Sequence, residues 1–596
     1  MRFGIFYEHQ LPRPWTPDDE HRLLTNALEQ IELADRLGID YAWEVEHHFL
    51  EEYSHSSAPE VFLAAASQRT GQIRLGHGIV HALPAVNHPA RIAERVATLD
   101  LVSGGRVDFG TGESSSAAEL GGFGVSREDK RTIWAETLDA VTRMFVESPF
   151  PGYDGDYLKM PPRMIVPRPL QQPHPPLWVA CSRRETILLA ARSGIGALSF
   201  SFVEPEDAAR WVNDYYDLIC SAECVPRGFA VNPNVAIVLP MMMHPDEQTA
   251  IERGIDGAHF FGYSLAHFYG GGAHAVGGTD LWESFSANRA EQGFAREIIT
   301  ADAAPLAVRL LQAGTGSLRG AIGTPAQVTD LLRRYEAVGI DQVIFVMQAA
   351  KNRHEHICES LELFASHVLP QFAENREKAE AAKADRLAGA IETALARRSP
   401  ARRLEQPYTI DEAAEVAAAR PAGPGRSGRS GRPGSPAGPV ALRSVASEAG
   451  GRAASALRHQ FGSGTRQLVS RASDGRLDQI FGTERAQRVI FNRMAGRLDP
   501  AKAGGFTGSI VYDLGLQDGT RACWTIEVRD GAVRAVPGRT EDAAVTIRLP
   551  LTDFVRGITS DGEPFMPLLM NGTMTVDGDL SVAARLGEMF GARSVY

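Results

Sequence analysis

The stretch Asp40-Tyr-Ala-Trp-Glu-Val-Glu-His-His-Phe49 joins a run of β-prone residues to three consecutive ionisable side chains. Its first part, with Ile39 before it, is predicted to form a strand from Ile39 to Glu44, because Ile, Tyr and Trp favour extended backbone. Glu46, His47 and His48 then follow at the carboxyl end of that strand. Histidine has an unperturbed pKa close to neutral, which suits proton transfer. The stretch therefore predicts a strand with a candidate reactive group at its end.

Short β-rich runs alternate with longer amphipathic segments on both sides of this strand. Leu23–Leu37, for example, carries apolar residues at helical spacing. Strands that alternate with helices indicate βαβ units and a parallel sheet. Eight strands in a body of this size favour an α/β fold of the closed (β/α)₈ TIM-barrel type over an open sheet. The predicted strands are Arg2–Tyr7, Ile39–Glu44, Ile73–Val80, Val107–Thr111, Leu177–Ala180, Leu198–Val203, Val235–Met241 and Val343–Met347.

Length and composition narrow the class of protein. A chain of 596 residues exceeds the roughly 250–300 residues of a single core, so we expect more than one domain. The net charge of −12 argues against nucleic-acid or anionic-membrane partners, because such partners bind to basic patches. No apolar run approaches the ~20 residues that span a bilayer, and the N-terminus leads into a strand instead of a signal peptide. We expect a cytoplasmic protein with no integral membrane part.

The 5 cysteines are scattered along the chain. They lack the paired spacings of a disulfide framework or a zinc site. Cys220 and Cys224 are close in sequence, but no second Cys or His pair follows nearby. No metal site is expected.

A change of composition divides the chain. Glu374–Arg397 is rich in Ala, Glu, Lys and Arg and predicts an exposed helix leading out of the first domain. From Arg420 to Pro439 almost no residue can enter a core, so this part is expected to be a disordered, flexible linker. Its arginines leave contact with RNA or acidic lipid open beside the role of a solvated tether. The expected domains are a barrel at 1–375, a helical extension and linker at 376–470, and a small α+β domain at 471–596.

Two features accompany the barrel. Cys181 to Thr186 follows a predicted strand and opens a predicted helix at Ile187, and helix N-termini attract anions. Ser182 and Thr186 supply hydroxyls and Arg183 or Arg184 supplies charge, so a phosphate site is one interpretation and a helix cap with solvated arginines is the other.

The long segment from Pro245 to Ile322 is rich in glycine and aromatics, including Phe261. It is expected to be a lid or substrate wall, although an inert excursion stays open.

Several blocks in order resemble the bacterial luciferase α subunit and its flavin-dependent monooxygenase relatives. They cover nearly all of residues 1–370. The blocks are Trp43–Phe49, Gly76–Val80, Asn87–Arg91, Leu99–Gly110, Pro167–Ala180, Gly323–Val328 and Ala337–Gln342.

The resemblance implies an enzyme that uses reduced FMN, supplied by a flavin reductase, and O₂ to transfer one oxygen atom to an organic substrate. His47 matches the family's catalytic histidine. Gly78-Ile79 matches the position of a non-prolyl cis peptide beneath the flavin, and Glu119 matches an acidic residue near the flavin, with a surface carboxylate as the alternative. Glu113 stands where many relatives carry an arginine for the FMN phosphate, and a carboxylate there would repel a phosphate.

His48 is the other histidine at the strand end. Adjacent side chains there point in different directions, so one of the two histidines is expected to face the pocket. His48 is assigned to a structural or substrate-binding position. For a bare His-His pair, two hydrogen-bonded loop residues are an equally good interpretation.

The tail resembles the sterol carrier protein type 2 fold. Thr507–Leu514, Ala522–Val528 and Ala544–Ile547 alternate as half-buried strands, and Asp530-Gly531 and Asp577-Gly578 are expected turns. The resemblance implies an apolar tunnel for lipid, with Phe554 and Met570 among its lining residues. The same residues also suit a solid core.

Three functions stay open at this point. The first is an FMN-dependent monooxygenase acting on a small apolar or lipid-like substrate that the tail helps to hold. The second uses a deazaflavin coenzyme for hydride transfer on the same barrel. The third is a lipid carrier with an inactive barrel, motivated by Glu113. Relatives often pair through barrel helices, so a homo-oligomer is also open.

Overall fold

The computed structural model describes residues 1–182, 184–199, 205–269, 274–288, 320–411, 474–496, 507–529, 532–540, 543–559 and 574–578. They fall into two compact units, Met1–Arg403 and Leu404–Val595, which are described separately. The part of the expected linker from 412 to 470 lies outside the described residues. No helix in the described parts of the chain combines the length and the apolar content needed to cross a membrane.

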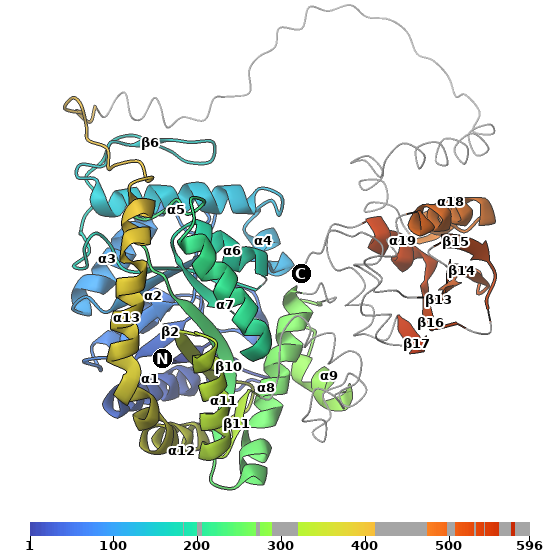
Figure 1. Ribbon diagram of the computed structural model, residues 1–596, viewed down its shortest axis with the longest axis horizontal. Helices are drawn as coiled ribbons and strands as arrows, with labels where there is room; N and C mark the ends of the chain where they lie inside the picture. Colours follow the sequence, from blue (N-terminus) through green and yellow to red (C-terminus); the bar gives the residue numbers. More distant parts are fainter. Residues whose placement is uncertain are drawn as a thin grey trace, which may run out of the picture. The chain divides into compact units, whose positions relative to one another are not determined.

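Eight parallel strands of the described residues close into a barrel in the first unit (Figure 1). Strand β12 pairs with β10 on one side and with β1 on the other, which closes the ring. The expected TIM-type barrel is confirmed. In order around the ring the strands are β1 (Arg2–Tyr7), β2 (Tyr41–Glu44), β3 (Arg74–His77), β5 (Val107–Gly112), β8 (Leu177–Cys181), β9 (Gly196–Ser199), β10 (Val235–Met243) and β12 (Gln342–Gln348).

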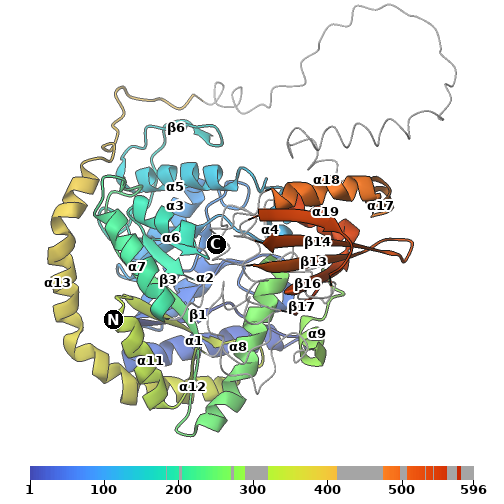
Figure 2. The ribbon, with the colours of Figure 1, turned by 45° about the vertical axis from the view of Figure 1, so that its right-hand side comes forward.

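Helices surround the strands (Figures 1 and 2). The covering helices are α1 (Asp19–Leu37), α2 (Pro59–Ser67), α3 (Pro89–Val102), α5 (Lys130–Val146), α6 (Arg184–Arg192), α7 (Pro205–Ile219), α11 (Pro325–Ala337) and α12 (His354–Leu363). Shorter elements decorate the loops: η1 (Glu51–Tyr53), α4 (Ala117–Gly122), β4 (Val80–His81), β6 (Tyr153–Asp154), β7 (Lys159–Met160) and β11 (Ala321–Gly323).

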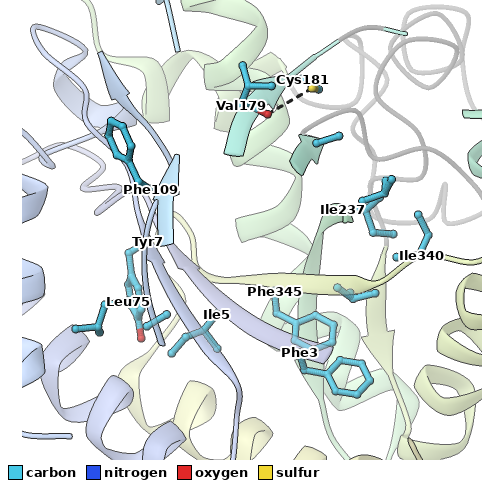
Figure 3. Packing of buried hydrophobic residues seen from close by; sticks show 14 of the residues in the cluster. Phe3, Ile5, Tyr7, Leu75, Phe109, Val179, Cys181, Ile237, Ile340 and Phe345 are labelled. Atoms are coloured by element: carbon cyan, nitrogen blue, oxygen red, sulfur yellow. Dashed lines mark hydrogen bonds between the residues drawn. The ribbon is translucent and has the colours of Figure 1, made fainter. Parts of the chain in front are cut away.

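The barrel core is built from strand residues that are buried on both faces. Every residue of β5, β10 and β12 is buried, as expected for parallel strands covered by helices. Phe3 and Phe345 come from neighbouring strands and lie together in Figure 3, with ring centroids 6.1 Å apart. Gly76 lets the Trp43 indole lie against β3, because a Cβ there would come within 2.2 Å of the ring.

The expected exposed helix is present as α13 (Leu369–Leu395), with a π-helical turn, η3 (Phe364–Val368), before it. Most of its residues are exposed, but Phe372, Leu387 and Ala394 are buried in the barrel core. Lys383 also binds Asp341 at 2.6 Å. The helix therefore packs along the outside of the barrel (Figure 2), and the first unit continues to Arg403.

The described residues of the segment between β10 and β11 include the helices α8 (Glu247–Tyr269) and α9 (Leu281–Asn288). Helix α8 is mostly buried, including Phe260 and Phe261. Residues 289–319 of this segment lie outside the described residues.

The second unit contains a mixed five-stranded sheet in the order β15-β14-β13-β16-β17. Phe491 stacks on Trp524 and on Phe554, with ring centroids 5.1 and 5.4 Å apart. The small α+β domain is confirmed, but Asp577-Gly578 lies in β17, paired with β16, instead of in a turn. The elements are α17 (Asp474–Phe481), α18 (Glu484–Ala495), β13 (Gly508–Gly515), β14 (Arg521–Arg529), β15 (Ala532–Pro537), β16 (Val545–Pro550), α19 (Leu551–Thr559) and β17 (Thr575–Gly578).

Candidate active site

The candidate site lies where the first barrel strands end. His47 and His48 follow β2, and Glu119 lies on α4, in the connection after β5. Nδ1 of His47 lies 3.0 Å from Oε1 of Glu119. The backbone N–H of His48 donates to the same oxygen, also at 3.0 Å. The structure thus brings Glu119 into contact with His47 and His48, from which it is separated by 72 and 71 positions in the sequence.

Glu119 has a hydrogen-bond partner at both of its carboxylate oxygens. Ser114 Oγ donates to its second oxygen, Oε2, at 2.6 Å. Burial opposes the charged form, but the positive charge and the hydrogen bond of His47 outweigh it and lower the pKa of Glu119 to about 2. Glu119 is therefore negatively charged at neutral pH and lies beside Nδ1 of His47.

His47 lies between two carboxylates. Its Nε2 is 3.6 Å from Oε2 of Glu8, the residue that follows β1. Burial alone would lower the pKa of His47, but the charges of Glu8 and Glu119 raise it to about 9. Tyr269, the last residue of α8, brings its hydroxyl to 3.4 Å from both ring nitrogens. His47 is an imidazolium at neutral pH, enclosed by acidic and phenolic groups.

His48 points to a different partner, as expected for adjacent residues at a strand end. Its Nε2 lies 3.1 Å from Oε1 of Glu46, and Asn87 donates to that same oxygen at 2.7 Å. The His48 ring packs edge-on against Phe123 at 5.0 Å. The exposed Phe49 ring lies beside both, which leaves an aromatic surface next to the histidine pair.

Two further histidines, His77 and His81, line this end of the barrel. Both are buried, and burial lowers the pKa of His77 to about 4 and also lowers the pKa of His81. Nε2 of His81 lies 3.8 Å from Oε1 of Glu119. His47, His81 and Glu119 bring donor atoms within 4.8 Å of one another.

Gly78 and Ile79 lie between β3 and β4. The Gly78 N–H donates to the Glu44 carbonyl at 2.7 Å, and Ile79 is buried against Gly112. The expectation of a cis peptide at this position is wrong. The cis bonds of the described residues all precede proline, and trans is the lower-energy form for other residues.

Glu113 has basic neighbours that the sequence did not reveal. Arg131 approaches its Oε1 at 2.9 Å and Lys130 at 3.7 Å. Both cations stand at the start of α5. Arg184, expected at the phosphate site, is instead paired with Asp214 at 2.8 Å. Two cations therefore face the single carboxylate that replaces the expected arginine.

The loop after β8 lies next to this cluster. The register of β5 and β8 pairs Thr111 with Val179, so the carboxyl ends of these two strands, at Gly112 and Cys181, meet at the same edge of the barrel. Burial raises the pKa of the Cys181 thiol to about 12, while the charge of Arg131 opposes that rise. Ser182 is exposed and Thr186 is half-buried at the first turn of α6. Arg183 lies outside the described residues.

The remaining expected residues fall in different places. Phe261 is buried in α8 and its ring lies 5.9 Å from that of Tyr53, whose hydroxyl donates to Glu8. Phe554 belongs to the aromatic core of the second unit. Met570 lies outside the described residues.

Sequence reasoning missed Glu8, Tyr53, Tyr269, Lys130 and Arg131. Glu8 offered a usable signal, because it is an acidic residue directly after a barrel strand, where reactive groups of this fold gather.

Known proteins resemble the chain in two separate parts. Residues 1–342 match the model of the luciferase-like monooxygenase family, and residues 491–591 match that of the SCP-2 sterol transfer family. An uncharacterized protein of Sinorhizobium fredii, y4wF, is 33% identical over 222 residues, which are 36% of this chain and 60% of that protein. The chain spans 60% and 48% of the length of the first two curated relatives it matches.

A flavin-dependent trigonelline monooxygenase, oxygenase component, from Acinetobacter baylyi is 23% identical over 381 residues, 63% of this chain and 97% of that protein. Among solved structures, the monooxygenase RslO1 from Streptomyces bottropensis is 26% identical, with a TM-score of 0.49 over 62% of this chain and all of that one (100%).

Proposed function

Since the chain belongs to the luciferase-like monooxygenase family, we propose that it uses reduced FMN and O₂ to insert one oxygen atom into a small apolar organic substrate. Bound reduced FMN would supply the two electrons that convert the other oxygen atom to water. A separate flavin reductase would deliver the reduced flavin in the cytoplasm. The observation that carries the proposal is the pairing of the half-buried His47 with the buried Glu119 at the carboxyl ends of the barrel strands.

The pair suits an oxygenase because it keeps a proton available in a site that is largely shielded from solvent. Glu119 binds Nδ1, so Nε2 is the nitrogen left to exchange a proton. The high pKa of His47 keeps that proton in place at neutral pH. A positioned general acid of this kind contributes roughly 10²–10⁴-fold to a rate.

The residues around Glu113 fit the FMN phosphate. Lys130 and Arg131 together outweigh the charge of Glu113, and the first turn of α6 adds backbone N–H groups with the hydroxyls of Ser182 and Thr186. In this proposal Glu113 orients the two cations, and Gly78-Ile79 supports the flavin ring. The missing arginine is thus replaced by charges from α5.

Substrate would lie against the aromatic surface beside the histidine pair. His48 and the exposed Phe49 present that surface, and Phe261 of α8 is proposed to contact the substrate as well. In the second unit, Phe554 and Met570 are proposed to contact an apolar ligand, in line with the SCP-2 match.

Two measurements test the proposal. Titration of FMN and of a deazaflavin coenzyme, each alone, should show flavin fluorescence changes for FMN; tight deazaflavin binding without any response to FMN would overturn the choice of cofactor. With reduced FMN and ¹⁸O₂, products from a panel of apolar substrates should carry one labelled oxygen. His47→Gln should lower that yield about 10²-fold or more, whereas His21→Gln, an exposed histidine of α1, should not.

A further inference from the structure

Glu8 is a buried carboxyl group with one oxygen unused. It follows β1 directly and is 2% exposed. Its Oε1 accepts a hydrogen bond from the Tyr53 hydroxyl at 2.9 Å. Its Oε2 has no hydrogen-bond partner among the described residues, yet it lies 3.6 Å from Nε2 of His47. Buried polar atoms normally have a partner, so Oε2 of Glu8 has capacity to accept the proton that Nε2 of His47 carries.

The two carboxyl groups that flank His47 differ in how many donors they have. Glu119 accepts from the His47 ring, the His48 backbone and Ser114. Glu8 accepts from a single neutral hydroxyl. Fewer donors leave a buried carboxylate less stabilised, and burial raises the pKa of Glu8 to about 7 despite the opposing charge of His47. Glu119 therefore stays charged while Glu8 changes its protonation near neutral pH.

We propose that Glu8 is the proton partner of His47, exchanging the Nε2 proton, while Glu119 holds the ring in place. In the exchange the N–H bond at Nε2 breaks and an O–H bond forms at Oε2 of Glu8. Imidazolium and carboxylate become imidazole and carboxylic acid, and no electrons are transferred. Glu8 acts through His47 and is a positioning and proton-relay residue; the inference rests on the proposed role of His47 in the oxygenation.

The other ionisable groups that face Glu8 leave it and His47 as the titrating pair. Burial raises the pKa of Tyr53 and of Tyr269 well above the ordinary value, so both stay neutral donors. Glu44, on β2, is paired with His9 at 2.9 Å and also accepts from Ser56. Glu119 keeps its charge down to pH values near 2.

Infrared titration of the full-length protein tests the exchange directly. Wild type should show a carboxylic-acid C=O band that disappears as the pH rises through about 7. Glu8→Gln should remove that band while Gln keeps an acceptor for Tyr53. Glu128→Gln, an exposed residue ahead of α5, is the matched control and should leave the band intact. If the band persists in Glu8→Gln, the proposal is wrong.

A second variant keeps the test valid if Glu8→Gln does not fold. His47→Gln leaves Glu8 in place but removes the positive charge that lowers its pKa. The Glu8 band should then disappear at a pH at least one unit higher, a tenfold change in proton affinity. An unchanged midpoint would show that the two groups are not coupled and would refute the partnership.

Turnover separates this inference from the proposed function. If wild type oxygenates a substrate with reduced FMN, Glu8→Gln should lower kcat at least tenfold and abolish the pH dependence near 7; an unchanged pH profile would count against the partnership. If wild type produces no oxygenated product but the infrared titrations couple Glu8 to His47, the proposed function fails and the proton partnership stands.

Discussion

Replacement of Glu119 by Gln tests the electrostatic basis of the site most directly. The pKa of His47 stands at about 9 against an ordinary 6.5, which corresponds to on the order of 3 kcal/mol of preference for the imidazolium. Glu119 is closer to His47 than Glu8 is, at 3.0 against 3.6 Å, and it alone makes a hydrogen bond. We therefore assign at least half of this preference, about 2 kcal/mol, to Glu119.

In Glu119→Gln the pKa of His47 should fall to about 7–8. NMR of ¹³C-labelled histidine rings measures this pKa. The stability of wild type should exceed that of the variant by a similar amount. For a histidine with a raised pKa, this advantage is fully present below 6.5 and is lost as the pH rises through about 9. For Glu119, with its lowered pKa, it is lost as the pH falls from 4.5 through about 2.

Urea unfolding of the first unit at pH 6, 8 and 10 measures the stability gap, with Glu128→Gln as the control for a neutral surface change. A His47 signal that still titrates near 9 in Glu119→Gln would refute the reasoning. If the stability difference between wild type and Glu119→Gln grows above pH 9, the predicted direction of its pH dependence is wrong.

Three other perturbations address the fold, the second unit and the phosphate site. Gly110→Ala should destabilise the barrel, because the new Cβ would lie 1.9 Å from the His77 carbonyl oxygen; Gly121→Ala, with nothing within 4 Å, should leave the thermal midpoint unchanged. Phe491→Ala should cost the second unit about 3–5 kcal/mol in urea unfolding, and an equal shift of the barrel transition would contradict independent units. Lys130→Met with Arg131→Gln should weaken FMN binding at least tenfold and spare riboflavin, which lacks the phosphate; an equal loss for both ligands in fluorescence titrations would place the phosphate elsewhere.

The barrel could be predicted because each strand carried its own signal. Strand β1 has the predicted bounds, Arg2–Tyr7. The predicted strand Ile73–Val80 is instead divided into β3 and β4, because Gly78 and Ile79 leave the ladder. Local hydrophobic patterns identify a strand well, but they do not show where its pairing is interrupted.

The sequence did not predict helix α8, because the segment contains glycines, which are poor helix formers. In the structure these glycines allow neighbouring side chains to pack closely against the helix. A Cβ at Gly254 would come within 2.4 Å of the Met242 Cβ, and one at Gly257 within 2.5 Å of the Asn352 side chain. Close packing on the barrel outweighs the low helix propensity, and this depends on tertiary contacts that the sequence does not display.

The sequence pointed to His47 and Glu119 as candidate site residues, but it did not point to the residues around them. His47 stood at the end of a recognisable strand, and the family resemblance added Glu119. Arg131 and Lys130 could not be linked to Glu113 because a loop and a short helix separate them in sequence, and their approach depends on how α4 and α5 are placed. Which residues distant in sequence compensate each other's charge depends on the three-dimensional fold.

The number of hydrogen-bond donors, more than burial, decides what each carboxyl group at this end of the barrel can do. Glu8, Glu46 and Glu119 are all buried. Glu46 accepts from Asn87 and from the His81 backbone and pairs with His48, and these contacts lower its pKa against the effect of burial. Glu119 behaves in the same way. Glu8, with one donor, is the exception, and its pKa lies near neutral. With His47 proposed as the proton donor, the distribution of donors in this chain favours Glu8 as the carboxyl group that exchanges a proton with it.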